Sequence, residues 1–271
     1  MGAGMRVGWI GAGQMGSQMA LRAARAGHDL VIFAQEIARR SELADAGASF
    51  AASAQAAVQG AELVCLCLFD DDQARAVMLT PGGAPSPALA AIAPHAVVAI
   101  HTSGSAALAL DLAAAAPPGV AVIDAPFSGQ DGHVESGKLN LLVGGDPAAL
   151  EAARPVLEAY GRPTHVGPLG SGQEIKLINQ FLYRVHREAA EAALSALEAK
   201  GVARATAAQA LSGCSGASWA LAGMGTGAPT AERRAAFQRY FEVYLAAAEM
   251  DRLDVDVLLR MGDVGEAADA S

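Results

Sequence analysis

The stretch GWIGAGQMGSQMA, residues 8–20, decides the fold that this 271-residue sequence predicts. It follows a strand-like apolar segment, opens a helical pattern, and spaces Gly11, Gly13 and Gly16 as G-x-G-x-x-G. In that context the first glycine allows a tight turn, the second lets the backbone approach a pyrophosphate, and the third lets the helix pack on the strand. The N–H groups and positive dipole end of the helix favour phosphate.

We therefore expect a dinucleotide-binding turn rather than a glycine-rich turn that binds nothing. The predicted contact residues are Gly11, Ala12, Gly13, Gln14, Met15 and Gly16.

Strand-like and helical segments alternate from Arg6 to about Gly167. Strand-like runs are 6–12, 29–34, 62–69, 96–103, 120–126 and 139–145, and helical runs between them include 14–27, 36–47, 72–79 and 105–116. Strands that alternate with helices form βαβ units with a mostly parallel sheet, and right-handed crossovers give a doubly wound domain. We expect an α/β Rossmann-type domain over residues 1–168.

After Gly172 the strand signals stop. Residues 173–201 form one long helical pattern, 203–213 and 231–254 predict further helices, and the end of the chain is polar. An all-α domain is therefore expected over residues 169–271, beginning with a long interdomain helix.

Composition excludes several classes of function. A net charge of -9 disfavours nucleic acid as a partner. The three cysteines form no disulfide framework, the His and Cys spacing resembles no metal site, and no apolar run reaches the length of a membrane span. The N-terminal residues carry no targeting pattern, so we expect a cytoplasmic protein that binds a small molecule and neither nucleic acid nor membrane.

The cofactor is expected to be NADP(H) rather than NAD(H). An acidic residue at the end of the second strand would bind the ribose 2′-hydroxyl of NAD, but Gln35 stands near that point. Arg39 and Arg40 follow and suit a 2′-phosphate, unless both are solvated helix residues. Glu36 keeps NAD open as the alternative.

Two further segments suggest a substrate site. Ser128 and Gly129 follow a strand at the sheet edge where ligands bind, and a hydroxyl there can hold a carboxylate or hydroxyl oxygen, although an ordinary turn has the same pattern. Lys176 shares a helical face with Asn179 and Gln180. If it faces a cleft between the domains, burial would lower its pKa and make it a usable acid or base; the alternative is a solvated surface lysine.

Three motifs, in order, resemble the β-hydroxyacid dehydrogenase family: GWIGAGQMGSQMALRAARAGHDL at 8–30, DAPFSGQDGHVESGKLNLLVGG at 124–145, and GSGQEIKLINQ at 170–180. The resemblance implies a 6-phosphogluconate dehydrogenase-like helical domain and a homodimer or homotetramer built on it. It implies that Lys176 is the general acid/base. It also implies substrate contacts from Ser128, Gly129, Gln130, Asn179 and Gln180, and nicotinamide contacts from residues 101–103, Thr102 and Ser103 among them.

The sequence departs from the family pattern at several points. Gln180 replaces an asparagine, Gln130 replaces a glycine, and His101 stands near a position where the family has an acid or a small residue. A Lys-Asp pair expected around 241–245 is missing. The sequence therefore predicts an NAD(P)-dependent oxidoreductase acting on a small 3-hydroxy acid or related alcohol. A reductase of an imine or non-acid carbonyl on the same fold, or a dinucleotide-binding protein without turnover, remain the alternatives.

Overall fold

The computed structural model describes residues 4–129, 131–222 and 224. By contacts the chain divides into two compact units, Met1–Lys176 and Leu177–Ser271. The division falls inside one long helix, α9 (Ser171–Glu198), so the N-terminal end of this helix through Lys176 belongs to the first unit. The proposed domain boundary at 168/169 precedes this helix.

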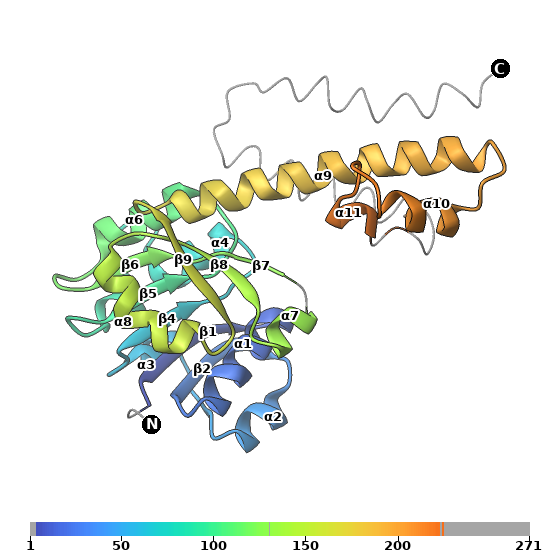
Figure 1. Ribbon diagram of the computed structural model, residues 1–271. Helices are drawn as coiled ribbons and strands as arrows, with labels where there is room; N and C mark the ends of the chain where they lie inside the picture. The colour runs from blue at the N-terminus through green and yellow to red at the C-terminus, as the bar shows by residue number, and fades with distance from the viewer. Residues whose placement is uncertain (1–3, 130, 223, 225–271) are drawn as a thin grey trace. The chain divides into compact units, whose positions relative to one another are not determined.

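The first unit is built on one sheet (Figure 1). Its strands are β1 (Arg6–Ala12), β2 (Asp29–Ile37), β3 (Ser49–Phe50), β4 (Leu63–Leu66), β5 (Val97–Ile100), β6 (Ala121–Asp124), β7 (Phe127–Ser128), β8 (Leu139–Gly144) and β9 (Gly161–Gly167). The order is β3-β2-β1-β4-β5-β6-β8-β7, and β9 pairs with β8. The pairs from β3 to β6 are parallel, whereas β8 is antiparallel to β6 and β7. The predicted doubly wound, mostly parallel sheet is confirmed.

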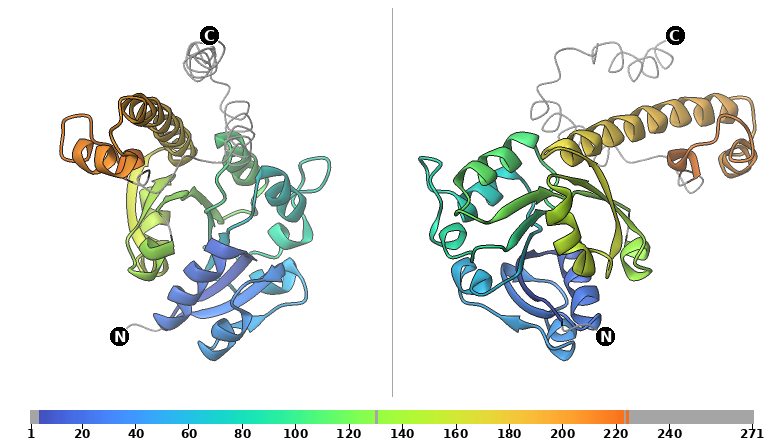
Figure 2. Two further views of the ribbon diagram at one scale, coloured as in Figure 1. Left: turned by 90° about the vertical axis from the view of Figure 1, so that its right-hand side faces the viewer. Right: turned by 60° about the vertical axis from the view of Figure 1, so that its left-hand side comes forward.

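Helices cover both faces of this sheet (Figure 2). They are α1 (Gln14–Arg25), α2 (Arg40–Asp45), α3 (Ala54–Val58), α4 (Asp71–Met78), α5 (Pro87–Ala90), α6 (Ala106–Ala115), α7 (Asp131–Glu135) and α8 (Pro147–Leu157). Alternate residues of the central strands enter opposite cores, as the two-residue period of a strand requires. Trp9 packs in the core with α1, α2, α7 and α8, and its neighbour Ile10 packs in the core with α3 to α6.

Side chains that cap the helices set several of the connections. The Asp70 carboxylate accepts a hydrogen bond from the Gln73 N–H (2.8 Å), and the Ser105 hydroxyl accepts one from the Leu108 N–H (3.2 Å). These caps begin α4 and α6 directly after β4 and β5, at the sheet edge formed by the carboxyl ends of the parallel strands. In doubly wound folds, ligands bind at this edge, where the strand order reverses between β1 and β4.

Three details differ from the expectation. The second strand extends to Ile37 and pairs with Ala12, so residues 36–39 are not helical and α2 begins at Arg40. The short strands β3 and β7 lack an apolar run. β9, GRPTHVG, has neither an apolar run nor alternation, yet it pairs in parallel with β8 along its whole length. Partner strands and tertiary packing override weak local propensity in these segments.

The second unit is helical over its described residues. It contains the rest of α9, α10 (Arg204–Leu211) and α11 (Trp219–Ala222). Leu194 lies at the centre of a small apolar core between these helices, and Arg204 pairs with Glu191 (2.6 Å) and Glu198 (3.0 Å) to hold α10 on α9. The helix expected at 231–254 and the polar tail lie outside the described residues. Among the described helices, none has the length and apolarity to cross a bilayer.

Candidate active site

The glycine turn lies at the end of β1. Gly11 is buried, has a φ of 94°, and a Cβ built on it would overlap the carbonyl oxygen of Cys67, which follows β4. Only glycine satisfies both the left-handed backbone and the close approach. The buried indole of Trp9 donates a hydrogen bond to the Gly11 carbonyl oxygen (2.9 Å) and so stabilises the turn from the core side.

The space in front of this turn suits a phosphate group. Gly13 is the N-cap of α1; it is exposed, and a Cβ built on it would meet nothing within 4 Å. No side chain caps the helix here, so the first turn of α1 presents its backbone N–H groups at an open surface. Gly16 lies against the Gly11 carbonyl and the Cys67 side chain, which brings α1 onto β1. These residues fit the pyrophosphate of a dinucleotide.

The residues expected to bind the ribose of the cofactor lie at and beyond the end of β2. Gln35 and Glu36 are exposed in the strand. Arg39 is exposed in the left-handed conformation (φ 56°), and its guanidinium pairs with Glu42 at 3.1 Å. Arg40 places its guanidinium over the Phe50 ring, 4.1 Å from the centroid. Arg39 is thus the better placed of the two arginines to bind a ligand, because an exposed ion pair is easily exchanged.

The loop after β5 begins with His101. This side chain is buried, with Nδ1 2.8 Å from the Ala125 carbonyl oxygen and Nε2 3.0 Å from the Tyr160 hydroxyl. Since a carbonyl only accepts, Nδ1 carries the proton and Tyr160 donates to Nε2. Burial lowers the pKa of His101 to about 4. The His101 side chain thus packs with Tyr160 and Trp9 inside the protein, and the nicotinamide contacts expected from residues 101–103 stay predictions.

Thr102 is also directed inward. Its hydroxyl accepts a hydrogen bond from the Leu68 N–H (3.0 Å), and its carbonyl accepts one from the Gln173 amide (2.8 Å). Ser103 is half-buried. Of the two loop residues predicted to bind the cofactor, Ser103 therefore has the side chain that is better able to reach a ligand.

Ser128 and Gly129 lie at the end of β7, where the two-residue strand pairs with β8. Both are half-buried, and Gly129 has a φ of 148°. Gln130 lies outside the described residues. The substrate contacts expected from this segment stay predictions.

Gly170 and Gly172 precede Lys176 and lie where the N-terminal end of α9 packs closely on the sheet. The buried Asp124 carboxylate, at the end of β6, accepts hydrogen bonds from the N–H groups of Gly170 (2.7 Å) and Gln173 (2.8 Å). A Cβ built on Gly172 would overlap the Leu142 carbonyl oxygen, so a glycine is needed for the helix to come this close to the sheet. Burial raises the pKa of Asp124, and the N–H donors of the helix oppose that shift.

Lys176 follows one turn later and is only 7% exposed. Its ammonium group donates a hydrogen bond to the Phe127 carbonyl oxygen (2.7 Å), the carbonyl next to Ser128 in the chain. Burial lowers the pKa of this amine from 10.5 to about 8. The alternative of a solvated surface lysine is therefore wrong, and an amine that can exchange its proton near neutral pH lies beside the Ser128 segment.

The two amides that follow on α9 belong to the second unit. Asn179 is exposed and Gln180 is half-buried. Their contact with a substrate oxygen stays a prediction, and residues 241–245, where a Lys-Asp pair was expected, lie outside the described residues.

Sequence reasoning missed Asp124, Gln173 and Tyr160. Asp124 had a signal, because a carboxylate that ends an apolar strand in DAP is buried at a cost unless N–H groups satisfy it. Gln173 and Tyr160 gave none, since their partners lie far away in the chain. Within the described ranges, no group of three or more His, Cys, Asp or Glu side chains is arranged to hold a metal ion.

Two family models match this chain. Residues 6–170 match the family model described as the NAD binding domain of 6-phosphogluconate dehydrogenase. Residues 170–257 match the model described as NAD-binding of NADP-dependent 3-hydroxyisobutyrate dehydrogenase.

Two curated relatives illustrate the range of names. NAD-dependent L-serine dehydrogenase of Pseudomonas aeruginosa is 39% identical over 182 residues, 66% of this chain and 60% of the relative. Probable 3-hydroxyisobutyrate dehydrogenase-like 3 of Arabidopsis thaliana, a mitochondrial protein, is 31% identical over 176 residues, 65% of this chain and 54% of the relative. The chain thus spans 54–60% of the length of these relatives.

Solved structures share the fold. 3-Hydroxyisobutyrate dehydrogenase of Mycobacterium tuberculosis, solved with L-serine, has a TM-score of 0.79 at 24% identity and covers 98% of this chain and 94% of its own. An imine reductase from Pseudomonas sp. has a TM-score of 0.64 at 20% identity and covers 78% of this chain and 72% of its own. Because a family model spans more than half of the 271 residues, and contains both the glycine turn and the Asp124 anchor of α9, the chain belongs to the β-hydroxyacid dehydrogenase family.

Proposed function

We propose that this protein is an NAD(P)-dependent oxidoreductase that interconverts a small 3-hydroxy acid, or a related alcohol, with its carbonyl form. The observation that carries this proposal is the buried amine of Lys176, hydrogen-bonded to Phe127 beside Ser128, with a pKa of about 8. General acids and bases work best when their pKa lies near the working pH.

The glycine turn would hold the cofactor. The backbone N–H groups from Gly13 to Gly16 would bind the pyrophosphate, and Gln35 with Arg39 would lie toward the ribose. When bound, a nicotinamide dinucleotide accepts a hydride from the alcohol carbon or returns one to the carbonyl carbon. The protein then has to orient the substrate, exclude water and move one proton.

Lys176 would move that proton. In the direction of oxidation, the neutral amine takes the hydroxyl proton of the substrate as the C–H hydride departs, and the C=O bond forms. In the direction of reduction, the ammonium returns a proton to the oxygen. The hydrogen bond to the Phe127 carbonyl keeps the nitrogen beside Ser128 in both protonation states, since the neutral amine retains two N–H donors.

The relatives suggest the substrate class. L-serine and 3-hydroxyisobutyrate, which occur in their names, are both 3-hydroxy carboxylates. Ser128 and Gly129 suit the carboxylate, since a hydroxyl and backbone N–H groups bind it without added charge. Gln130, Asn179 and Gln180 would complete the contacts and set the preference among 3-hydroxy acids.

NADP(H) is the cofactor that we favour. Arg39 is exposed beyond β2, and a 2′-phosphate would compete with Glu42 for its guanidinium. NAD(H) remains the rival, because Glu36 is exposed in the same strand and one relative is named as NAD-dependent. If Arg39 reads the phosphate, Arg39→Ala should weaken NADPH binding and leave NADH binding unchanged.

A homodimer or homotetramer and a cytoplasmic location complete the proposal. Light scattering after size-exclusion chromatography tests the first. A fluorescent fusion of the full chain in its host cell tests the second.

The decisive experiment combines binding and turnover. Purified protein is titrated with NADPH and NADH by fluorescence, then assayed in both directions with L-serine, 3-hydroxyisobutyrate and other short 3-hydroxy acids. Lys176→Ala should lower kcat by about 100-fold or more and leave cofactor binding nearly unchanged, whereas the exposed control Lys200→Ala should behave as wild type. Binding without turnover by the wild type across the panel would favour a non-catalytic dinucleotide-binding protein.

A second candidate keeps the fold and changes the substrate. Imine reductases share the architecture, and glutamines replace smaller family residues at 130 and 180. Cyclic imines assayed beside the hydroxy acids separate the two, and reduction of an imine at the higher rate would replace our proposal.

A further inference from the structure

The buried amide of Gln173 joins the lysine-bearing helix to the loop after β5. Its side chain is 1% exposed and uses both ends of the amide. Oε1 accepts a hydrogen bond from the Gly104 N–H (3.0 Å), and the Nε2 group donates one to the Thr102 carbonyl oxygen (2.8 Å). A two-ended amide contact of this kind fixes both the distance and the rotation of the helix relative to the loop.

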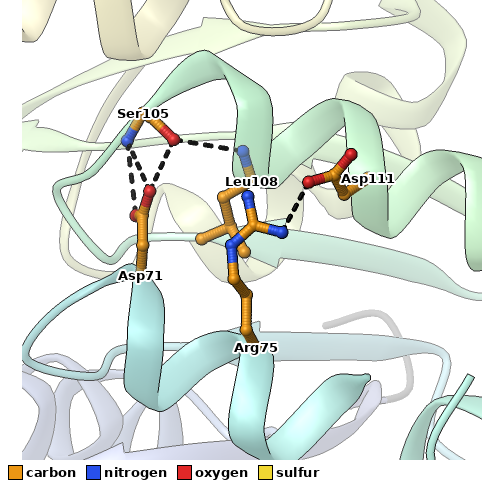
Figure 3. A network of polar contacts seen from close by, with 5 residues as sticks. All are labelled: Asp71, Arg75, Ser105, Leu108 and Asp111. Atoms are coloured by element: carbon orange, nitrogen blue, oxygen red, sulfur yellow. Dashed lines mark hydrogen bonds and ion pairs between the residues drawn. The ribbon is translucent and has the colours of Figure 1, made fainter. Parts of the chain in front are cut away.

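The same loop is fixed on its other side. The Asp71 carboxylate, in the first turn of α4, accepts hydrogen bonds from the Ser105 N–H (3.0 Å) and the Ser105 hydroxyl (2.5 Å), as Figure 3 shows. Nearby, Arg75 of α4 pairs with Asp111 of α6. The loop from Thr102 to Ser105 is thus held between α4 and α9.

A continuous series of contacts leads from this loop to the glycine turn. Thr102 accepts a hydrogen bond from the Leu68 N–H, and the neighbouring Cys67 carbonyl lies against Gly11. Gln173 therefore connects the phosphate-binding turn to α9, three residues before Lys176, through contacts that all lie within the first compact unit.

We propose that Gln173 is a positioning residue, which holds the Lys176 amine at a fixed place relative to the dinucleotide turn by tying the first turn of α9 to the Thr102–Gly104 loop. This proposal deepens the proposed function and rests on it for the role of Lys176. The backbone N–H of Gln173 donates a hydrogen bond to Asp124, so the side-chain amide is the part of this residue that binds the loop after β5. Small displacements of a catalytic group cost rate while substrate and cofactor still bind.

The test uses Gln173→Met, which keeps the length and volume of the side chain and removes both hydrogen bonds, and Gln173→Asn, which keeps the amide but shortens it. The matched control is Glu174→Gln, an exposed change in the same helical turn. Both Gln173 variants should lower kcat by about tenfold or more, with the NADPH dissociation constant and the cofactor KM changed by less than about threefold. Glu174→Gln should match wild type.

A second readout needs no turnover. Lys176 in the unliganded protein is modified with an amine-specific reagent at several pH values, and mass spectrometry measures the extent of modification. Amide hydrogen exchange of residues 102–106 is measured on the same proteins. Modification of Lys176 and exchange of the loop should both be faster in the Gln173 variants, because the contact between Lys176 and Phe127 opens more often. If either variant fails to fold, the other decides.

Wild-type kcat together with wild-type lysine modification in a folded Gln173 variant would overturn the proposal. A loss of activity that only follows a loss of cofactor affinity would overturn it as well. An inactive wild-type enzyme would instead contradict the proposed function, and the modification and exchange rates would then judge Gln173 alone.

Discussion

The ammonium nitrogen of Lys176 lies 2.7 Å from the carbonyl oxygen of Phe127, the residue that precedes Ser128. This acceptor is neutral, so it stabilises the charged amine less than a carboxylate would. With the side chain 7% exposed, the cost of desolvation lowers the pKa of Lys176 to about 8. The contact with Phe127 thus places the amine, and burial lowers its pKa.

The pH dependence of turnover should reverse with the direction of reaction. Oxidation needs the neutral amine, so kcat for hydroxy acid oxidation should rise with pH and level off above about 8. Reduction needs the ammonium, so kcat should fall as pH rises through the same value. Initial rates at saturating cofactor, measured in each direction from pH 6 to 10, test this. Profiles that rise together in both directions would rule out a single group that exchanges the proton.

The stability of the protein should also follow the titration of Lys176. Between the folded pKa of about 8 and the unfolded value of 10.5, the unfolded state binds more protons, so stability rises with pH in this range. Wild type should therefore gain up to about 3 kcal/mol relative to Lys176→Met from pH 7.5 to 10.5. Urea unfolding at four pH values measures the difference. A difference that is independent of pH would mean that the amine is not buried in solution.

The sequence predicted the parts of the site that depend on local pattern. The glycine spacing, the Ser128 segment and Lys176 each lie in motifs that one stretch of chain specifies, and the parallel sheet follows from alternation of strands and helices. The burial of Lys176 could only be posed as one of two alternatives. The helix that carries Lys176 is hydrogen-bonded to Asp124, which lies 52 residues before Lys176 in the sequence. A contact over that separation leaves no periodic signal.

The burial of His101 was equally out of reach of the sequence. A histidine that follows a strand at the ligand edge fits a surface or an interior position equally well. Tyr160 fixes the interior position, because its hydroxyl donates a hydrogen bond to Nε2 from 59 residues away in the sequence. The β9 segment was missed because its pairing with β8, rather than its own propensity, makes it a strand.

The two glycines Gly11 and Gly13 should respond differently to alanine. Gly11→Ala forces a left-handed alanine against the Cys67 carbonyl, so it should destabilise the fold by about 2 kcal/mol or more. Gly13→Ala adds a methyl group to open space at an ordinary φ of -67°, so it should cost at most about 1 kcal/mol, the difference between glycine and alanine at an N-cap. Cofactor binding should nevertheless weaken about tenfold or more, because that space receives the pyrophosphate.

Thermal unfolding and NADPH titration together measure this pair, and Gly82→Ala, also in open space, serves as the control for a harmless methyl group. If Gly13→Ala binds NADPH as wild type does, the dinucleotide does not approach the turn here.

His101 should make the protein sensitive to acid. The folded protein holds this imidazole neutral, with a pKa of about 4, whereas the unfolded chain protonates it near 6.5. Between these values the unfolded state binds the extra proton, so stability is complete above about pH 6.5 and falls as pH drops toward 4. The loss reaches about 3 kcal/mol, and His101→Gln should remove that part of the pH dependence even though it lowers stability at pH 7. Urea unfolding of wild type and variant at pH 7, 5.5 and 4.5 gives the two slopes, with the exposed His95→Asn as the control, since asparagine tolerates the left-handed backbone there. Parallel slopes for wild type and His101→Gln would show that the imidazole accepts its proton without unfolding, and would contradict the lowering of its pKa by burial.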